Sequence, residues 1–354
     1  MKSSIDKRNS KYVSSKLKVI IPVMLIILAV FLILACTFGA VYIPFIQTVK
    51  IILKNLGILS NTTFPGGHEP IIISVRLPRV IIAALVGAAL ATSGAVMQGM
   101  FRNPMADPGI LGVSSGAGLG AVIAIALGLT AKSLFYMPVF ASIGALSAAS
   151  VIFLLSTKRG KVPVLTIILA GIAVSTFIGA ITSMILTFIR GSQVKEFLFW
   201  SIGNLSLSRW EFVSIAYIPI ILGVAIMFIF ARDLNVLMLG EEEAQAVGLN
   251  PAITRKVLLL LTSVTTAAAV CISGSISFVG LIVPHIMRLI VGPDHRILLP
   301  TSALGGAIFL VGCDLIARVV VLPYEIGVGI VTSLLGAPYF LFLLIRARKE
   351  GGVF

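Results

Sequence analysis

Charged residues are scarce in this sequence. They make up 11% of its 354 residues, while hydrophobic residues make up 58%. A soluble domain of average composition is about one quarter charged, so the scarcity excludes an ordinary water-exposed surface. The chain contains several apolar runs of about 20 residues, the length that a helix needs to cross a bilayer. The composition therefore indicates a polytopic membrane protein.

Cysteine is also rare. Cys36, Cys271 and Cys313 lie inside apolar runs without paired spacing, which indicates packing residues and not a disulfide framework. Residues 33–36 weakly match a lipoprotein cleavage site, but many further apolar runs follow. The first run is therefore expected to remain as a membrane anchor.

Acidic residues are outnumbered by basic ones, 13 to 27, which gives a formal net charge of +14. The basic residues are scattered at the ends of apolar runs and are not gathered with aromatic residues, so nucleic-acid binding is not expected. With an even number of spans and an inner N-terminus, eighteen basic residues fall on the cytosolic side and nine outside. This bias predicts that both termini are cytosolic.

Ten apolar runs follow one another, near residues 19–40, 80–100, 109–129, 135–156, 163–189, 211–231, 257–273, 277–292, 297–320 and 326–345. They predict an all-α polytopic fold of about ten transmembrane helices, forming one transmembrane domain over 19–354 after a basic cytosolic tail at 1–18. The run at 277–292 is short and begins with glycine-rich sequence, so a bent or partial helix is expected there. The segment 41–79 is expected outside.

A short polar turn separates the second and third apolar runs. Pro104 and Pro108 fix their own φ angles and disfavour helix at the residues before them, Asn103 and Asp107. One helix must therefore end near Arg102, and another must begin after the second proline.

This turn and four other segments resemble the FecCD family, the permease subunits of ATP-binding-cassette (ABC) importers for ferric siderophores, haem and cobalamin. The resemblance extends from about residue 41 to the end, and its motifs lie at 76–79, 97–112, 239–248, 274–296 and 336–340. It implies a BtuC-like permease fold with structural loops at Arg102, Asn103, Pro104, Asp107, Pro108, Pro284 and His285.

The connector 234–250 between the sixth and seventh runs predicts a short surface helix. Glu241, Glu242 and Glu243 suit the positive end of a helix, and Gly248 with Pro251 supplies a stop. An ordinary solvated loop is the alternative. The resemblance implies a coupling helix that docks on the ATPase through Leu239, Gly240, Glu241, Glu242, Ala244 and Gly248.

The sequence has no phosphate-binding loop of the Walker A type. Its only Gly-Lys pair, Gly160-Lys161, is followed by Val162, so the chain is not expected to bind ATP or to be an enzyme. ATP and Mg²⁺ are expected on a separate ATPase partner, and no cofactor is expected on this chain.

Three arginines mark the outer ends of two predicted spans. Arg76 and Arg79 precede the second span and Arg318 ends the ninth. Arginines at such boundaries commonly anchor a helix at the interface, whereas the resemblance implies that these three grip acidic residues of a substrate-binding protein, a task that suits the forked guanidinium group. Asp314 is expected to pair with Arg318 four residues later and not to relay protons.

The motif at 274–296 contains possible metal ligands. His285, Met287 and His295 lack a third strong ligand at a suitable spacing, so no metal site is expected. A cytosolic turn that positions the coupling helix is the preferred interpretation.

The resemblance, taken with these features, implies the permease subunit of an importer for a ferric siderophore in the cytoplasmic membrane of a bacterium. The expected partners are a second permease, either itself or a paralogue, two ABC ATPase subunits and an extracytoplasmic binding protein, expected as a lipoprotein. Haem and cobalamin remain alternative substrates. An ion-coupled secondary transporter is less well supported because mid-span ionisable residues are nearly lacking, and a receptor or scaffold would not need the glycine-rich, broken helices.

Overall fold

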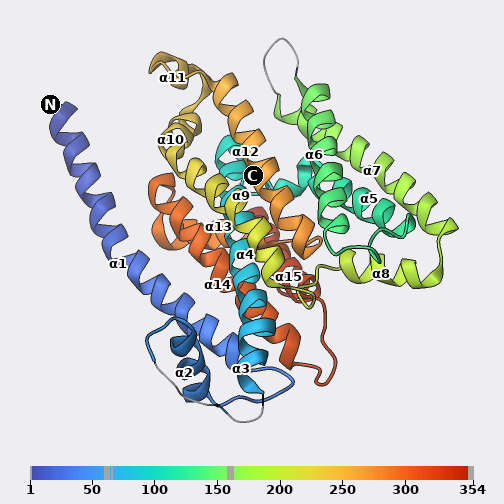
Figure 1. Ribbon diagram of the computed structural model, residues 1–354. Coiled ribbons are helices and arrows are strands. Elements are labelled where there is room, and N and C mark those ends of the chain that lie inside the picture. Colours follow the sequence, from blue (N-terminus) through green and yellow to red (C-terminus); the bar gives the residue numbers. More distant parts are fainter. Residues whose placement is uncertain (1, 60–63, 65–66, 158–162, 350–354) are drawn as a thin grey trace.

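The computed structural model describes residues 2–349 except 60–63, 65–66 and 158–162 (Figure 1). The elements, in chain order, are α1 (Lys2–Thr37), α2 (Phe45–Asn55), α3 (His68–Pro70), η1 (Ile71–Arg76), α4 (Leu77–Phe101), η2 (Pro108–Leu111), α5 (Val113–Ala126), α6 (Tyr136–Ser156), α7 (Val164–Phe188), α8 (Gly191–Ser201), α9 (Trp210–Ile229), α10 (Ala231–Leu239), α11 (Glu241–Ala246), α12 (Pro251–Ser273), α13 (Val279–Val291), α14 (His295–Val319) and α15 (Val328–Lys349). The described residues contain helices and no strands, which confirms the predicted all-α class.

Seven helical segments are long and apolar enough to cross a membrane, and three shorter apolar helices accompany them in the described part of the chain. Together they account for the ten predicted runs. The shorter ones are α5, α13 and the apolar part of α15, Val328–Leu343. The expectation of a partial helix near 277–292 is confirmed, because α13 has only 13 residues and follows the irregular segment 274–278.

The second span begins earlier than its sequence predicted. The chain is helical from His68, through α3 and the π-helical turn η1, into α4. Pro78 lies just after the π-helical turn η1, and because proline has no backbone N–H, it removes one bond from the continuous helix at this junction. Apolar periodicity cannot locate this start, because two arginines interrupt the sequence at the point where the helix is already formed.

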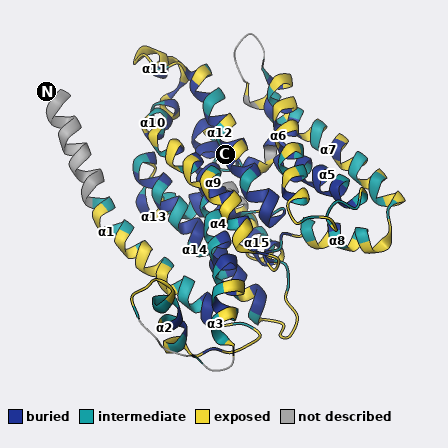
Figure 2. Ribbon diagram, viewed as in Figure 1, coloured by how far each residue is buried: buried dark blue, intermediate teal, exposed yellow. Residues whose placement is uncertain are grey.

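Helix α4 lies at the centre of the bundle and contacts α9, α12, α13 and α14. Figure 2 shows it as almost continuously buried. Glycine allows α4 and α14 to approach closely: a Cβ atom on Gly87 would lie 2.1 Å from the carbonyl oxygen of Gly306 on α14, and one on Gly306 would lie 2.1 Å from that of Gly87. Backbones pack directly where small residues meet, so these glycines serve contacts inside one subunit.

The start of α1, the loop before α12 and helix α11 lie at one end of the bundle, and α2 and α3 lie at the other (Figure 1). We refer to these as the α11 end and the α2 end. The arrangement agrees with an even number of crossings between the start of α1 and α11.

Candidate functional site

The connector 234–250 folds as two short helices and not as the single helix predicted. Helices α10 and α11 meet at Gly240, whose φ of 151° lies in the region that favours glycine. A Cβ atom there would lie 1.8 Å from a carboxylate oxygen of Glu243. The bend at Gly240 therefore divides the connector: α11 begins at Glu241 and ends before Gly248, as its acids and Gly248 predicted, while the residues before Gly240 belong to the separate helix α10.

The two helices differ in how they pack. Helix α10 buries Leu234 and Leu237 in the main apolar core, whereas α11 buries only Ala244. Leu239 and Val247, at the two ends of α11, are each 69% exposed. Exposed apolar side chains beside a cluster of acids are typical of a protein-binding surface. We call residues 239–248 the coupling surface.

The six residues predicted to dock on an ATPase do not lie alike. Leu239, Glu241, Glu242 and Gly248 are exposed, while Gly240 and Ala244 are buried. The acids occupy the first turn of α11, where the helix dipole favours them. The buried pair shapes the coupling surface from behind, and the exposed members form it.

Two further contacts fix α11 to the bundle. Glu241 forms an ion pair with Arg255 near the start of α12. At the other end, Gly248 has a φ of +87°, and the N–H of Leu249 donates to the carbonyl oxygen of Ala244 at 3.0 Å. This bond ends α11 and turns the chain toward α12. No local sequence pattern marks Arg255 for this role.

The turn after α4 has the rigid geometry that its prolines predict. Arg102 ends α4 with a φ of 51°. The side chain of Asn103 accepts a hydrogen bond from the N–H of Met105 at 2.8 Å, and Asp107 accepts one from Gly109 at 2.7 Å. Pro108 then opens η2. Side-chain to backbone bonds of this kind replace helical bonds in a sharp turn.

Pro284 and His285 lie inside α13 and not in a loop. Pro284 is buried, and the ring of His285 contacts Tyr339 of α15 edge to face, with centroids 6.3 Å apart. These two residues therefore contribute to helix packing, which corrects their expected place in a structural loop. The described residues hold no cluster of three potential metal ligands from His, Cys, Asp and Glu.

The three predicted docking arginines form an internal network at the α2 end. Arg76 donates to the carbonyl oxygens of Cys36 and Thr37 at 2.7 and 2.8 Å, and Arg318 donates to that of Ala35 at 2.9 Å. These are carbonyls at the end of α1, which have no partner within the helix. Both guanidinium groups therefore hold the end of α1 against α4 and α14.

The same network contains two carboxylates. Arg79 is 2.9 Å from Asp314 and 2.7 Å from Glu325, and Asp314 is 3.1 Å from Arg318. The i,i+4 pair between Asp314 and Arg318 is thus confirmed. No role was predicted for Glu325, which lies in the connection between α14 and α15.

The network changes how the arginines must be interpreted. Arg76, Arg79 and Arg318 are 5%, 6% and 3% exposed, and each has partners within the chain. They are not free surface groups in this structure, because burying an unpaired guanidinium group would be too costly. Any contact with a binding protein has to be made over or within this network.

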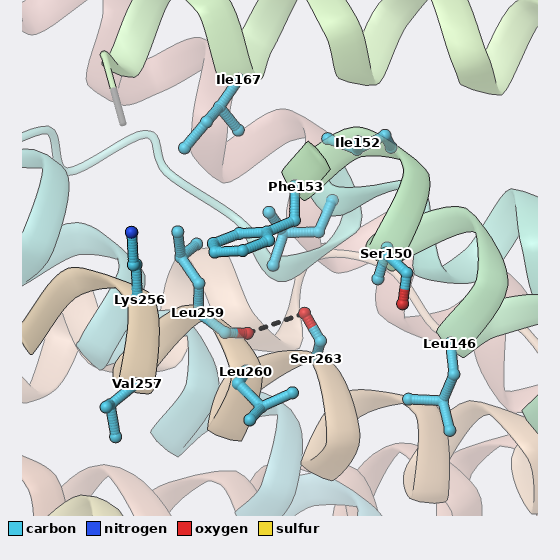
Figure 3. Close-up of a pocket in the computed structure, with 12 residues that line it drawn as sticks. Leu146, Ser150, Ile152, Phe153, Ile167, Lys256, Val257, Leu259, Leu260 and Ser263 are labelled. Atoms are coloured by element: carbon cyan, nitrogen blue, oxygen red, sulfur yellow. Dashed lines mark hydrogen bonds between the residues drawn. The ribbon is translucent and has the colours of Figure 1, made fainter. Parts of the chain in front are cut away.

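An apolar cavity of about 270 Å³ lies between α6, α7, η2 and α12 (Figure 3). Phe153, Ile167 and Leu259 line it, and Lys256 lies at its edge. The hydroxyl of Ser263 donates to the carbonyl oxygen of Leu259 at 2.7 Å and is thus already engaged. Such a lining suits hydrocarbon and lacks the polar groups that orient a charged ligand.

A second cavity, of about 420 Å³, is more polar. It lies where the end of α8, the segment before α13 and α15 meet, and four serines line it: Ser201, Ser275, Ser277 and Ser333. Hydroxyl groups donate and accept hydrogen bonds without carrying charge. This lining can contact a polar ligand weakly at several points.

The chain is similar to known membrane permeases. The FecCD transport family matches residues 26–346. The cobalamin import permease BtuC of Halobacterium salinarum is 48% identical over 280 residues, covering 79% of this chain and 74% of its own. The hemin transport permease HmuU of Yersinia pestis is 42% identical over 306 residues, covering 84% and 91%. The iron(3+)-hydroxamate import permease FhuB of Bacillus subtilis is 42% identical over 281 residues, covering 79% and 72%.

A solved structure of an inward-facing metal-chelate type ABC transporter superposes with a TM-score of 0.80 at 32% identity, covering 92% of this chain and 99% of that one. Nearly the whole chain is therefore matched by this fold. This chain belongs to the FecCD transport family of ABC importer permeases.

Proposed function

We propose that this chain carries a ferric siderophore across the cytoplasmic membrane, as the permease subunit of an ABC importer. The coupling surface is the observation that carries the importer role, because Leu239 and Val247 are exposed beside the acids of α11 and are not covered by the part of the chain that the structure describes. Iron chelates are named for FhuB and for the Fe(3+)-citrate permease YfmD of Bacillus subtilis, which is 38% identical.

Cobalamin is the second candidate. The relative from Halobacterium salinarum, at 48% identity, is named for it. Cobalamin, haem and ferric siderophores are all bulky chelates that enclose their metal. The serine-lined cavity supports weak contacts with any of them, so the choice among them rests with the binding protein that delivers the substrate.

The proposed partners follow from the two ends of the bundle. An ABC ATPase docks on the coupling surface at the α11 end, which we place in the cytosol, and it holds the ATP and Mg²⁺. An extracytoplasmic binding protein docks at the α2 end, above the arginine network. A second permease, identical or paralogous, completes the translocation path.

Transport then uses nucleotide-driven motion of the ATPases. ATP binding draws the ATPases together and displaces α11, which is fixed to α12 through Glu241 and Arg255. Because helices are rigid elements, displacement at one end is transmitted along them. The transmembrane helices thereby open alternately to the two sides of the membrane.

The test is uptake into proteoliposomes that hold the permease, its cognate ATPase and its binding protein. We expect radioactive iron delivered as a hydroxamate chelate to accumulate only with ATP inside and to stop with orthovanadate. Preferential uptake of cobalamin or haem would identify that chelate as the substrate in place of a siderophore. Uptake that continues without ATP and collapses with a protonophore would instead establish a secondary transporter.

A further inference from the structure

Asn235 lies on α10, one turn before the coupling surface, and faces the start of α14. Its side-chain nitrogen donates to Asp294 at 2.7 Å. Its side-chain oxygen accepts from the backbone N–H of His295 at 2.9 Å and lies 2.7 Å from ring atom Nδ1 of the same histidine. Both polar atoms of this amide are thus engaged by the first residues of α14 and its cap.

Asp294 is held in place independently of Asn235. It caps α14 by accepting from the N–H of Arg296 at 3.0 Å, and the guanidinium group of Arg296 binds the same carboxylate at 2.6 Å. Burial opposes its ionisation, but the bonds from Arg296 and Asn235 outweigh this and lower the pKa of Asp294 to about 2. The carboxylate is therefore charged at physiological pH and is a strong acceptor for the amide.

His295 carries the contact on to α4. Its side chain is buried, and its ring lies against Gly99, where a Cβ atom would be only 2.4 Å from Nε2. Gly99 is two residues before the end of α4 and the rigid turn that follows. The amide of Asn235 thus reaches both α14 and α4 through one buried ring.

Helix α14 connects the two ends of the molecule. It has 25 residues, which at 1.5 Å per residue is about 37 Å. Its far end carries Asp314 and Arg318, the core of the arginine network. Movement applied to its first turn is therefore carried to the region where we place the binding protein.

We propose that Asn235 is a positioning residue that links movement of the coupling surface to α14 and α4. The inference rests on the proposed importer function. Apolar contacts, such as those of Leu234 and Leu237, allow sliding, whereas a side-chain amide bonded at both atoms fixes one orientation. Asn235 makes α10 and the start of α14 move as one unit, so that ATP hydrolysis is coupled to transport of the substrate.

The test compares Asn235→Asp with Arg232→Ala in the reconstituted transporter. The aspartate keeps the shape and the acceptor for His295 but replaces the donor to Asp294 with a second negative charge. Arg232 is exposed on the same helix and serves as the matched control. We measure uptake of a ferric hydroxamate and ATP hydrolysis in the same vesicles.

We expect Asn235→Asp to lower uptake per ATP hydrolysed about tenfold while ATP hydrolysis stays within about twofold of wild type, since single positions along a coupling route have effects of this size. Arg232→Ala should leave the ratio unchanged. The double variant Asn235→Asp/Asp294→Asn exchanges amide and carboxylate, and it should recover most of the lost ratio.

Two results would overturn the inference. One is an unchanged ratio of uptake to ATP hydrolysis in Asn235→Asp. The other is that Asn235→Asp loses both uptake and the ATPase from the purified complex, which would make Asn235 a purely structural residue. Failure of the exchange variant to recover the ratio in an intact complex would also contradict it. If the wild-type complex shows no ATP-driven uptake of any chelate, the proposed function itself fails.

Discussion

Arg79 and Asp314 form a buried ion pair that joins α4 to α14, with Nη2 of the arginine 2.9 Å from Oδ1 of the carboxylate. The two residues are 235 positions apart in the sequence. Asp314 is fully buried and also pairs with Arg318, so one carboxylate serves two guanidinium groups. Its removal would leave two buried cations without their main counter-charge.

Asp314→Asn should therefore destabilise the protein strongly. Breaking a buried pair by removing one partner costs about 3–5 kcal/mol. The control is Glu325→Gln, because the Glu325 side chain is 38% exposed and solvent screens its pair with Arg79. The thermal unfolding temperature in detergent should fall by a large amount for Asp314→Asn and by a small amount for Glu325→Gln. Equal falls would contradict the central role of Asp314.

Glu325→Gln should strengthen binding-protein docking, if docking occurs over the arginine network. Glu325 occupies Arg79 through a 2.7 Å contact in the free permease. An incoming carboxylate must compete with it, and the neutral amide removes this competition. We expect a dissociation constant about threefold to tenfold lower for the binding protein encoded with the permease. Titration by surface plasmon resonance measures this constant. Weaker binding would show that a carboxylate of the binding protein does not replace Glu325 at Arg79.

Leu239→Ser should weaken ATPase docking about tenfold, as expected when an exposed apolar anchor of an interface is truncated. The matched control is Leu260→Ser on α12, since Leu260 is 64% exposed against 69% for Leu239 but lies within a span, away from the coupling surface. The amount of ATPase that co-purifies with the permease gives the comparison. Loss in both variants would indicate general damage, and loss in neither would exclude Leu239 from the interface.

Gly306→Ala should destabilise the bundle because the new Cβ would lie 2.1 Å from the carbonyl oxygen of Gly87, forcing α4 and α14 apart. Overpacking of this kind costs about 1–3 kcal/mol or more. Gly179→Ala on α7 is the control, because no described atom beyond its chain neighbours and its own helix backbone lies within 4 Å of a Cβ built there. Helix propensity favours alanine there by about 1 kcal/mol. The thermal unfolding temperature should fall for Gly306→Ala and rise for Gly179→Ala. A shift of both in the same direction would contradict the packing argument.

The ten apolar helices and the turn after α4 could be predicted from local sequence. Bilayer length fixes the helices, and the fixed φ angles of Pro104 and Pro108 fix the turn, so neither depends on distant residues. The short helix α13 was predictable because glycine-rich sequence precedes it. The family could be identified because its motifs lie in local segments of this kind.

Features set by distant contacts could not be predicted. The burial of Arg79 depends on Asp314 and Glu325, and the capping role of Arg76 depends on where α1 ends. The division of the coupling connector depends on one glycine conformation at residue 240, which the acidic run beside it conceals. Asn235 gave no signal, because a single asparagine in an amphipathic stretch is ordinary until its partners are known.

The way in which α1 is held has a consequence for its sequence. Only 17% of its most apolar window is buried, and its polar attachment runs from Arg76 and Arg318 to backbone carbonyls at its final turn. A carbonyl is the same whichever side chain the residue carries. Residues 16–30 could therefore be replaced by another apolar sequence without loss of these hydrogen bonds. The condition is that the last turn of α1 still ends beside the two guanidinium groups. The side chains of α1 can therefore vary during evolution while its attachment through backbone carbonyls is kept.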